Sequence, residues 1–268
     1  MSFAALDSLD WPVFEPGTVW LVGAGPGAPG LLSLLGYRGL LEADVVVYDA
    51  LVSDALLALA NPAAERIYAG KRGGKPSPKQ ADISLRLVEL AEAGKRVLRL
   101  KGGDPFIFGR GAEEALALVA RGIRFRIVPG ISAGVGGLAY AGIPVTHRDT
   151  NQAVVFLTGH DESGGIPAAV DWAAVANAAP IIVMYMAVKH LRSIADKLMA
   201  AGRAPADRVA VVCNAALPDQ YVVDGTLGDI ARIEPMLKAP AIVVVGAVGG
   251  LRQDLDWYVG ALRENGLG

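Results

Sequence analysis

The sequence predicts an α/β protein of two domains, and three observations point to this class. The chain has 268 residues, of which 53% are hydrophobic and 19% charged. It is therefore long enough for about two domains and too apolar to be a disordered or fibrous chain. Short β-branched runs recur along it, with helix-period segments between most of them. This alternation is typical of α/β domains whose sheets are mostly parallel or mixed.

Eight apolar runs are the predicted strands, and many of them end at Gly, Asp or Asn. They are 19–24, 45–50, 97–103, 125–130, 154–160, 181–186, 209–214 and 241–246. Four segments between them have helical periodicity, namely 79–94, 111–122, 188–202 and 226–238. In the first of these, Ile83, Leu87 and Leu90 share one face and Gly94 is a suitable C-cap.

The predicted domain boundary is the polar stretch 145–152, because it follows a Gly-Ile-Pro turn and precedes a new strand–helix series. This divides the chain into an N-terminal domain over 16–148 and a C-terminal domain over 149–250. Residues 1–15 and 251–268 are expected to be peripheral.

Charge is distributed unevenly although the net charge is only −2. Between Arg66 and Arg110 there are eleven Lys or Arg residues against four Asp or Glu residues, a surplus of seven positive charges. A basic segment in an otherwise acidic chain predicts one anion-binding surface.

Several classes of protein are excluded on simple grounds. The single cysteine, Cys213, allows neither an intrachain disulfide nor a cysteine-based zinc site, and the three histidines lack metal-ligand spacing, so no metal is expected. The N-terminus lacks the basic region of a signal peptide, and no apolar run reaches about 18 residues. We therefore expect a soluble cytoplasmic protein without a membrane partner.

A glycine loop follows the first predicted strand. Gly23, Gly25 and Ala28 fit the dinucleotide fingerprint G-x-G-x-x-G/A, and Asp49 lies about 20 residues further on. An NAD(P)-dependent oxidoreductase is therefore one alternative, and a plain strand-to-helix turn is another. Pro26 and Pro29 weigh against pyrophosphate binding, because each removes a backbone N–H from the loop.

Seven motifs in a fixed order carry a resemblance to a known family. They are GAGPG at 23–27, DVVVYDALV at 44–52, GKRGG at 70–74, RLKGGDPFIFGRG at 99–111, PGISAG at 129–134, AYAGIPVTHR at 139–148 and LTGH at 157–160. In this order and spacing the chain resembles the tetrapyrrole methylases, the class III S-adenosylmethionine-dependent methyltransferases, and within them those that act on uroporphyrinogen III. The stretch 99–111 is the most specific of the seven.

The resemblance implies the tetrapyrrole methylase fold, with a ligand cleft between two α/β domains, and a homodimer. It implies S-adenosylmethionine as co-substrate, no metal, and methylation of uroporphyrinogen III at C2 and C7. The product is precorrin-2, formed through precorrin-1, in cobalamin or sirohaem biosynthesis. Without a further domain for oxidation or chelation, the reaction is expected to stop there. The alternative within the family is a methylase of a later corrin intermediate. An RNA-methylating role is disfavoured, since aromatic residues make up only 6% of the chain.

The family's site residues carry over to positions of this sequence. The implied cofactor contacts are Pro26, Gly102, Gly103, Asp104, Ile107, Ser132, Ala133, Met186 and Ala215. Asp49 falls on the proposed proton acceptor and Lys71 on the proposed proton donor, although Lys71 could equally bind a carboxylate. Some positions depart from the usual pattern, including Ala28 in place of Asp and Pro76 in place of His.

The implied acceptor carries eight carboxylates, so it needs cationic partners. The basic segment offers Arg72, Lys75, Lys79, Lys101 and Arg110 for this purpose. For each of these residues taken singly, a solvated surface charge remains the alternative interpretation.

Overall fold

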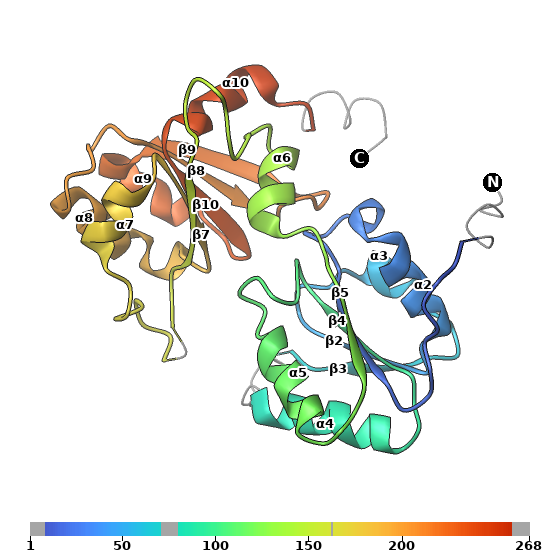
Figure 1. Ribbon diagram of the computed structural model, residues 1–268. Coiled ribbons are helices and arrows are strands. Elements are labelled where there is room, and N and C mark those ends of the chain that lie inside the picture. Colours follow the sequence, from blue (N-terminus) through green and yellow to red (C-terminus); the bar gives the residue numbers. More distant parts are fainter. Residues whose placement is uncertain (1–8, 71–79, 162, 259–268) are drawn as a thin grey trace. The chain divides into compact units, whose positions relative to one another are not determined.

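The computed structural model describes residues 9–70, 80–161 and 163–258, and these fold into two α/β units (Figure 1). The first unit contains the described residues up to Gly25 and from Pro29 to Gly130. The second contains the segment Pro26–Ala28 and the described residues from Ile131 onward. Each unit has one five-stranded sheet. The predicted fold class, two α/β domains with parallel or mixed sheets, is confirmed.

The sheet of the first unit is parallel throughout, in the order β3-β2-β4-β1-β5. Its strands are β1 (Val19–Gly23), β2 (Val45–Tyr48), β3 (Glu65–Tyr68), β4 (Val97–Lys101) and β5 (Phe125–Val128). The helices that connect them are η1 (Pro29–Leu31), α2 (Leu34–Glu42), α3 (Asp54–Leu57), α4 (Gln80–Glu92) and α5 (Gly111–Val119).

Alternating side chains divide this sheet between two cores. Trp20 and Val22 face the side covered by α2 and α3, where they pack with Leu40 and Leu56. Val19 and Leu21 face the opposite side, which α4 and α5 cover (Figure 1). The period of two residues in a strand explains why a nearly continuous apolar run serves both faces.

Strands β1 and β4 are neighbours whose connections leave in opposite directions. β1 is followed by α2 on one face of the sheet, and β4 is followed by α5 on the other. Such a point in an open parallel sheet leaves a crevice at the carboxyl ends of the two strands, where ligands of α/β proteins are generally bound. In this chain the residues that follow Gly23 and Lys101, the last residues of β1 and β4, lie at that point.

The sheet of the second unit is mixed, in the order β6-β7-β10-β8-β9. Its strands are β6 (Val154–Thr158), β7 (Ile181–Tyr185), β8 (Arg208–Cys213), β9 (Tyr221–Thr226) and β10 (Ala241–Val245). The helical segments are η2 (Ala133–Gly137), α6 (Leu138–Tyr140), α7 (Trp172–Ala178), η3 (Val188–His190), α8 (Leu191–Ala200), η4 (Leu227–Asp229), α9 (Ile230–Ile233), η5 (Glu234–Met236), η6 (Ala247–Leu251) and α10 (Arg252–Leu255).

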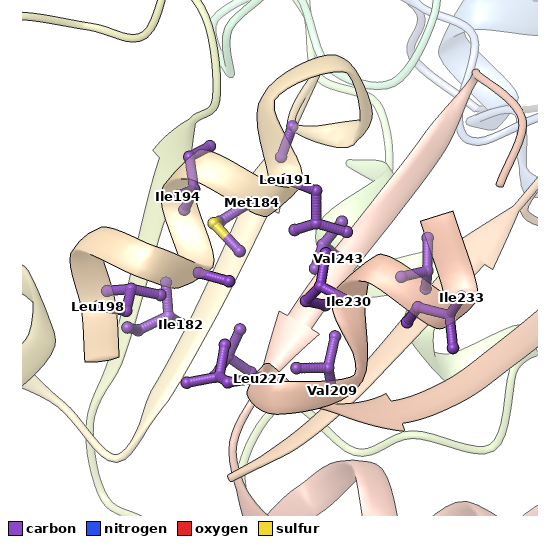
Figure 2. Packing of buried hydrophobic residues seen from close by; sticks show 14 of the residues in the cluster. Ile182, Met184, Leu191, Ile194, Leu198, Val209, Leu227, Ile230, Ile233 and Val243 are labelled. Carbon is purple, nitrogen blue, oxygen red and sulfur yellow. The ribbon is translucent and has the colours of Figure 1, made fainter. Parts of the chain in front are cut away.

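One face of this second sheet carries the apolar cluster shown in Figure 2. Ile182 and Met184 of β7 lie against Leu191, Ile194 and Leu198 of α8. The α8 residues recur at three- and four-residue intervals, so they form one apolar stripe. The opposite face packs against α6 and η6.

Strands β7 and β8 run in the same direction, because each is antiparallel to β10 between them. Their carboxyl ends, Tyr185 and Cys213, therefore lie at the same edge of the sheet. This places the loops after both strands, with Met186 and Ala215, at one edge.

The observed division between the units differs from the predicted boundary at 148. Residues after Gly130 already belong to the second unit, because Leu138, Ala141 and Ile143 are buried against Ile181 and Val183 of β7. The polar stretch at 145–152 is a connection inside that unit.

The predicted peripheral ends are also partly integrated into the units. Phe14 is buried and stacks on Trp20 at a centroid distance of 4.4 Å. Near the other end, Trp257 and Tyr258 pack against Tyr140 of α6. Residues 1–8 and 259–268 lie outside the described part of the chain.

All eight predicted strands are present, but β3 and β9 were not predicted. Both are edge strands, and β3 carries the exposed charges of Glu65 and Arg66, so it lacks the apolar run that identifies a buried strand. The predicted helix over 226–238 is divided into η4, α9 and η5. α9 ends at Ile233, and Pro235, which lies within η5, has no N–H to donate to Ala231 O as a continued α-helix would require.

Leu98 in the middle of β4 offers a test of the first core. Leu98→Ala is expected to lower the free energy of unfolding of the first unit by about 2–5 kcal/mol, because the side chain is fully buried and its loss leaves a cavity. Denaturant unfolding followed by circular dichroism measures this change. The matched control is Leu116→Ala on α5, where the leucine is 68% exposed, and its effect should stay within about 0.5 kcal/mol. Equal effects of the two substitutions would contradict the assigned core.

Candidate functional site

Three backbone segments meet very closely at the carboxyl edge of the first sheet. A Cβ atom at Gly23 would lie 2.5 Å from Gly130 Cα and 2.6 Å from Gly103 O, and one at Gly130 would also collide with Gly103 O. The backbone of Gly103 donates to Gly25 O at 2.8 Å, and Gly25 donates back to Gly103 O at 3.1 Å. Glycine is therefore required at these positions by chain-to-chain contact.

This packing changes the interpretation of the glycine loop. In a dinucleotide site the loop runs directly into a helix whose first N–H groups bind pyrophosphate. Here η1 intervenes, α2 begins only at Leu34, and the Ser33 hydroxyl accepts a hydrogen bond from Gly36 N at 3.1 Å. The helix N-terminus is thus capped by the protein itself. The geometry disfavours the oxidoreductase alternative.

Asp104 holds the loop that follows β4. One carboxylate oxygen accepts from Phe106 N at 2.7 Å and the other from Gly130 N at 3.0 Å. Asp104 therefore joins the end of β4 to the end of β5, a role that the sequence did not reveal. Each oxygen retains a second lone pair that a ligand could use.

Asp49 lies one residue after β2, at the same edge of the sheet. Its Oδ1 accepts from Leu51 N at 3.0 Å, and its Oδ2 lies 3.6 Å from Arg99 Nη2. Oδ1 is therefore held by a hydrogen bond, whereas Oδ2 forms an ion pair with Arg99 that is longer than a hydrogen bond. Residue 102 in the same region must be glycine, because a Cβ at that position would lie 2.5 Å from Leu51 Cβ.

Lys101 is not available to bind substrate carboxylates, contrary to the prediction. It is only 3% exposed, and its Nζ donates to Glu114 Oε1 at 3.0 Å. Burial, reinforced by the positive charge of Arg99, lowers the pKa of Lys101, while Glu114 opposes this shift. Arg99 shares the same acceptor, Glu114 Oε1, at 3.2 Å.

Other residues of the predicted basic set are placed differently. Arg110 is exposed, with a left-handed backbone (φ 58°), and forms a bidentate pair with Glu113 at 2.7 and 2.8 Å. This pairing lowers the pKa of Glu113. Ile107 is exposed in the same loop, between Phe106 and Phe108. The remaining predicted cations, and the predicted proton donor, lie outside the described residues; these are Lys71, Arg72, Lys75 and Lys79.

In the second unit Ser132 and Ala133 lie beside the end of β7. Tyr185 OH is 2.7 Å from Ser132 Oγ and accepts from Gly134 N at 2.9 Å. Tyr185 was not among the predicted site residues, since a tyrosine at the end of an apolar strand gives no signal by itself. Gly134 cannot carry a side chain, because a Cβ there would collide with Tyr185 OH.

The loops after β7 and β8 adopt backbone conformations that are uncommon for residues with side chains. Met186, Asn214 and Ala216 have φ angles of 53°, 50° and 60°. The Ala216 N–H is held by the buried Gln220 side chain at 2.7 Å. Residues held in this region of backbone space cluster at functional sites. Met186 is itself a predicted contact, and Asn214 and Ala216 flank another, Ala215.

Two predicted contacts of the second unit, Ala133 and Ala215, lie close together because Gly137 beside them has no side chain. A Cβ at Gly137 would lie 2.7 Å from Ala215 Cβ and 3.8 Å from Ala133 Cβ. The segment Pro26–Ala28 belongs to the same group, because Gly27 approaches Ala215 O and the Leu217 side chain. Pro26 Cγ lies 3.6 Å from the Cβ position of Gly136.

The histidines form no common site. His160 Nδ1 is 3.2 Å from Met186 O, and His190 Nε2 is 2.8 Å from Gly164 O. His147 contacts Thr150 Oγ1 through Nδ1 at 3.3 Å. Within the described ranges, no three or more His, Cys, Asp or Glu side chains are grouped so that they could hold a metal ion.

The described helices were compared with the length and apolar character that a membrane span requires. Among the helices that the structure describes, none combines the length and the apolar character needed to cross a bilayer.

Comparisons with known proteins agree on one family. The sequence profile described as Tetrapyrrole (Corrin/Porphyrin) Methylases matches residues 18–231. A protein of Sinorhizobium sp named uroporphyrinogen-III C-methyltransferase is 62% identical over 255 residues, which are 94% of this chain and 90% of that protein. The siroheme synthase of Zymomonas mobilis is 46% identical over 91% of this chain, which spans only 51% of that longer protein.

A solved structure gives the same result for the fold. The uroporphyrin-III C-methyltransferase of Thermus thermophilus, complexed with S-adenosylhomocysteine, superimposes with a TM-score of 0.76 at 40% identity. The match covers 86% of this chain and 98% of that one.

Gly130→Ala tests the close contact at the edge of the first sheet. The added methyl group is expected to lower the free energy of unfolding by about 1–3 kcal/mol, because Gly103 O and Gly23 Cα leave no room for it. Thermal unfolding with matched denaturant titrations measures the loss. Gly30→Ala is the control, since nothing lies within 4 Å of its Cβ position, and it should be neutral or slightly stabilising. A neutral Gly130→Ala would disprove the contact.

Proposed function

The chain belongs to the tetrapyrrole methylase family, and from that premise we propose that it transfers methyl groups from S-adenosylmethionine to uroporphyrinogen III. Two successive transfers, at C2 and C7, give precorrin-1 and then precorrin-2, with S-adenosylhomocysteine as the second product. The observation that carries the proposal is the 62% identity, over nearly the full length of both chains, to the Sinorhizobium enzyme of that name. It favours uroporphyrinogen III over a later corrin intermediate.

The residues at both strand edges suit a sulfonium cofactor. The assigned contacts Pro26, Gly102, Gly103, Asp104, Ile107, Ser132, Ala133, Met186 and Ala215 include one acid and no lysine or arginine. A cation at sulfur is thus spared like-charge repulsion, while backbone groups, the Ser132 hydroxyl and the Asp104 carboxylate can bind its amino and hydroxyl groups. The small side chains at Ala133 and Ala215 leave room for close approach of a flat adenine.

When bound, S-adenosylmethionine supplies an electrophilic methyl group. The protein's task is mainly alignment of donor and acceptor, and such positioning is worth up to about 7–11 kcal/mol in favourable cases. Methylation of an electron-rich ring carbon leaves the tetrapyrrole positively charged until a proton is lost. We assign Asp49 to this step, because its carboxylate accepts a hydrogen bond from Leu51 N and pairs with Arg99, and it can accept the proton or stabilise the positive charge.

Cationic side chains would bind the substrate's carboxylates. Arg110 is the best-placed described candidate, since it is exposed and its pairing with Glu113 is a surface contact that a substrate carboxylate can replace. Arg72, Lys75 and Lys79 are proposed on the family resemblance alone, as is Lys71 as proton donor or carboxylate anchor. Lys101 is withdrawn from this set because it is buried.

The biosynthetic role follows from the relatives. The chain spans about half of the siroheme synthase it matches, and we propose that it performs the methylation that such longer proteins contain, supplying precorrin-2 for sirohaem or cobalamin. Two further parts of the proposal stay predictions: the homodimer, which rests on the family resemblance, and the cytoplasmic location, which rests on the sequence analysis.

A labelling experiment tests the activity. Purified protein incubated with methyl-labelled S-adenosylmethionine and uroporphyrinogen III is expected to place two labelled methyl groups on each tetrapyrrole, as read by mass spectrometry. Heat-denatured protein serves as the control. A tetrapyrrole without label would refute the proposal. A thermal shift with NADPH but none with S-adenosylhomocysteine would instead revive the oxidoreductase alternative.

Asp49→Asn tests the assigned role of the carboxylate. The substitution keeps the size of the side chain but removes its charge and basicity, so kcat should fall by about 10²–10⁴-fold. The dissociation constant for S-adenosylhomocysteine, measured by calorimetry, should change little. Asp44→Asn, at the opposite end of β2, is the matched control and should leave kcat unchanged. Full activity of Asp49→Asn would remove Asp49 from the mechanism.

A further inference from the structure

A cluster of buried charges lies on the face of β4 that α5 covers. Arg99 and Lys101 are each 3% exposed and Glu114 is fully buried. Charges are normally kept out of protein interiors unless they are paired, because their hydration is lost. Neither Arg99 nor Glu114 has a role in the proposed function so far, so the cluster calls for an explanation.

Every side of the Arg99 guanidinium has a partner. Its Nε donates to Glu114 Oε1 at 3.2 Å, and its Nη1 donates to Leu100 O at 3.0 Å and Val47 O at 3.4 Å. The remaining nitrogen, Nη2, faces Asp49 Oδ2 at 3.6 Å. The planar group is therefore oriented by Glu114 and two carbonyl oxygens, and its Nη2 faces Asp49.

A single oxygen of Glu114 accepts hydrogen bonds from both cationic side chains. Its Oε1 accepts from Arg99, from Lys101 Nζ at 3.0 Å and from Gln80 Nε2 at 3.1 Å. Its Oε2 is buried and has no hydrogen-bond partner among the residues that the structure describes. The three donors therefore converge on the oxygen that orients Arg99.

Asp49 contributes to the charge balance of this cluster. Arg99 and Lys101 are cationic side chains, Glu114 supplies one negative charge, and Asp49, through its contact with Arg99, supplies another. The Asp49 carboxylate after β2 is 24% exposed, so it is the outer member of an electrostatic chain that begins at the buried Glu114 on α5.

We propose that Arg99 and Glu114 are positioning residues for Asp49: Glu114 orients the Arg99 guanidinium, and Arg99 holds the Asp49 carboxylate at the place where it acts on the substrate. This inference rests on the role of Asp49 in the proposed function. Glu114 on α5 and Arg99 on β4 thereby influence the chemical step through Asp49, although both are buried away from the substrate.

A double-mutant cycle tests the inference. Arg99→Lys keeps the positive charge but loses the planar fork, since an ammonium group cannot contact Glu114, two carbonyls and Asp49 together. In the otherwise unchanged enzyme, kcat should fall by about 10- to 100-fold, as expected for a displaced reacting group. The KM for S-adenosylmethionine and the affinity for S-adenosylhomocysteine should change by less than about threefold. In the Asp49→Asn background, Arg99→Lys should cause no further loss.

The matched control is an ion pair beside the same two strands, β2 and β4. Arg96 and Asp44 form an ion pair at 2.7 Å at the opposite end of β4 and β2. Arg96→Lys should leave kcat unchanged in both backgrounds. Glu114→Gln is the second variant, because it keeps an acceptor oxygen for Arg99 but removes the charge. It should lower kcat in the unchanged enzyme and have no effect beside Asp49→Asn.

Several outcomes would overturn the inference. The first is full kcat in both Arg99→Lys and Glu114→Gln. The second is an equal loss of kcat in the unchanged enzyme and in the Asp49→Asn background. The third is failure of both variants to fold, which would assign the cluster to stability. These results are distinct from failure of the proposed function. An inactive unaltered enzyme refutes that function, and an active Asp49→Asn refutes the role of Asp49, whereas an impaired Asp49→Asn beside a normal Arg99→Lys refutes only this inference.

Discussion

The first unit depends on the contact between the backbones of Gly23, Gly103 and Gly130. Because no side chain separates them, the ends of β4, β1 and β5 are held at van der Waals distance, and the loops beyond them start from fixed points. Asp104 strengthens the contact by bonding to Gly130 N. These segments follow the point where the connections of β1 and β4 diverge, which is where α/β proteins generally bind ligands and where precise alignment of two reactants is needed.

The second unit also places its predicted contacts at one edge of its sheet, but with a different strand arrangement. Its sheet is mixed, yet β7 and β8 point the same way because β10 lies between them in reverse. Met186 and Ala215 thereby follow strands that end at one edge, and Tyr185 ties Ser132 and Gly134 to that edge. Both units thus bring small residues to the ends of their strands. The first unit adds the carboxylates of Asp49 and Asp104, and the second adds the Ser132 hydroxyl.

Much of this could be predicted from the sequence, and the exceptions have physical reasons. Buried strands were found because their apolar runs are continuous, whereas the edge strand β3 carries charges where it meets solvent. The domain boundary was misplaced because the partners of Leu138 lie on β7, far along the chain. Lys101 was taken for a surface cation, although its spacing from Val97 places both on one face of β4, opposite Glu114 on α5. Only the three-dimensional pairing of β4 with α5 reveals that this charge is internal.

The short segment Pro26–Ala28 has a consequence for dissecting the molecule. It belongs to the second unit, although the residues on either side of it belong to the first. The polypeptide therefore passes from one unit to the other three times, after Gly25, after Ala28 and after Gly130. No single cut yields two complete pieces, and a fragment ending at Gly130 would retain Gly27 but lose its neighbours Ala215 and Leu217. Gene fusions, split versions and domain exchanges within this fold must treat the pair of units as one indivisible module.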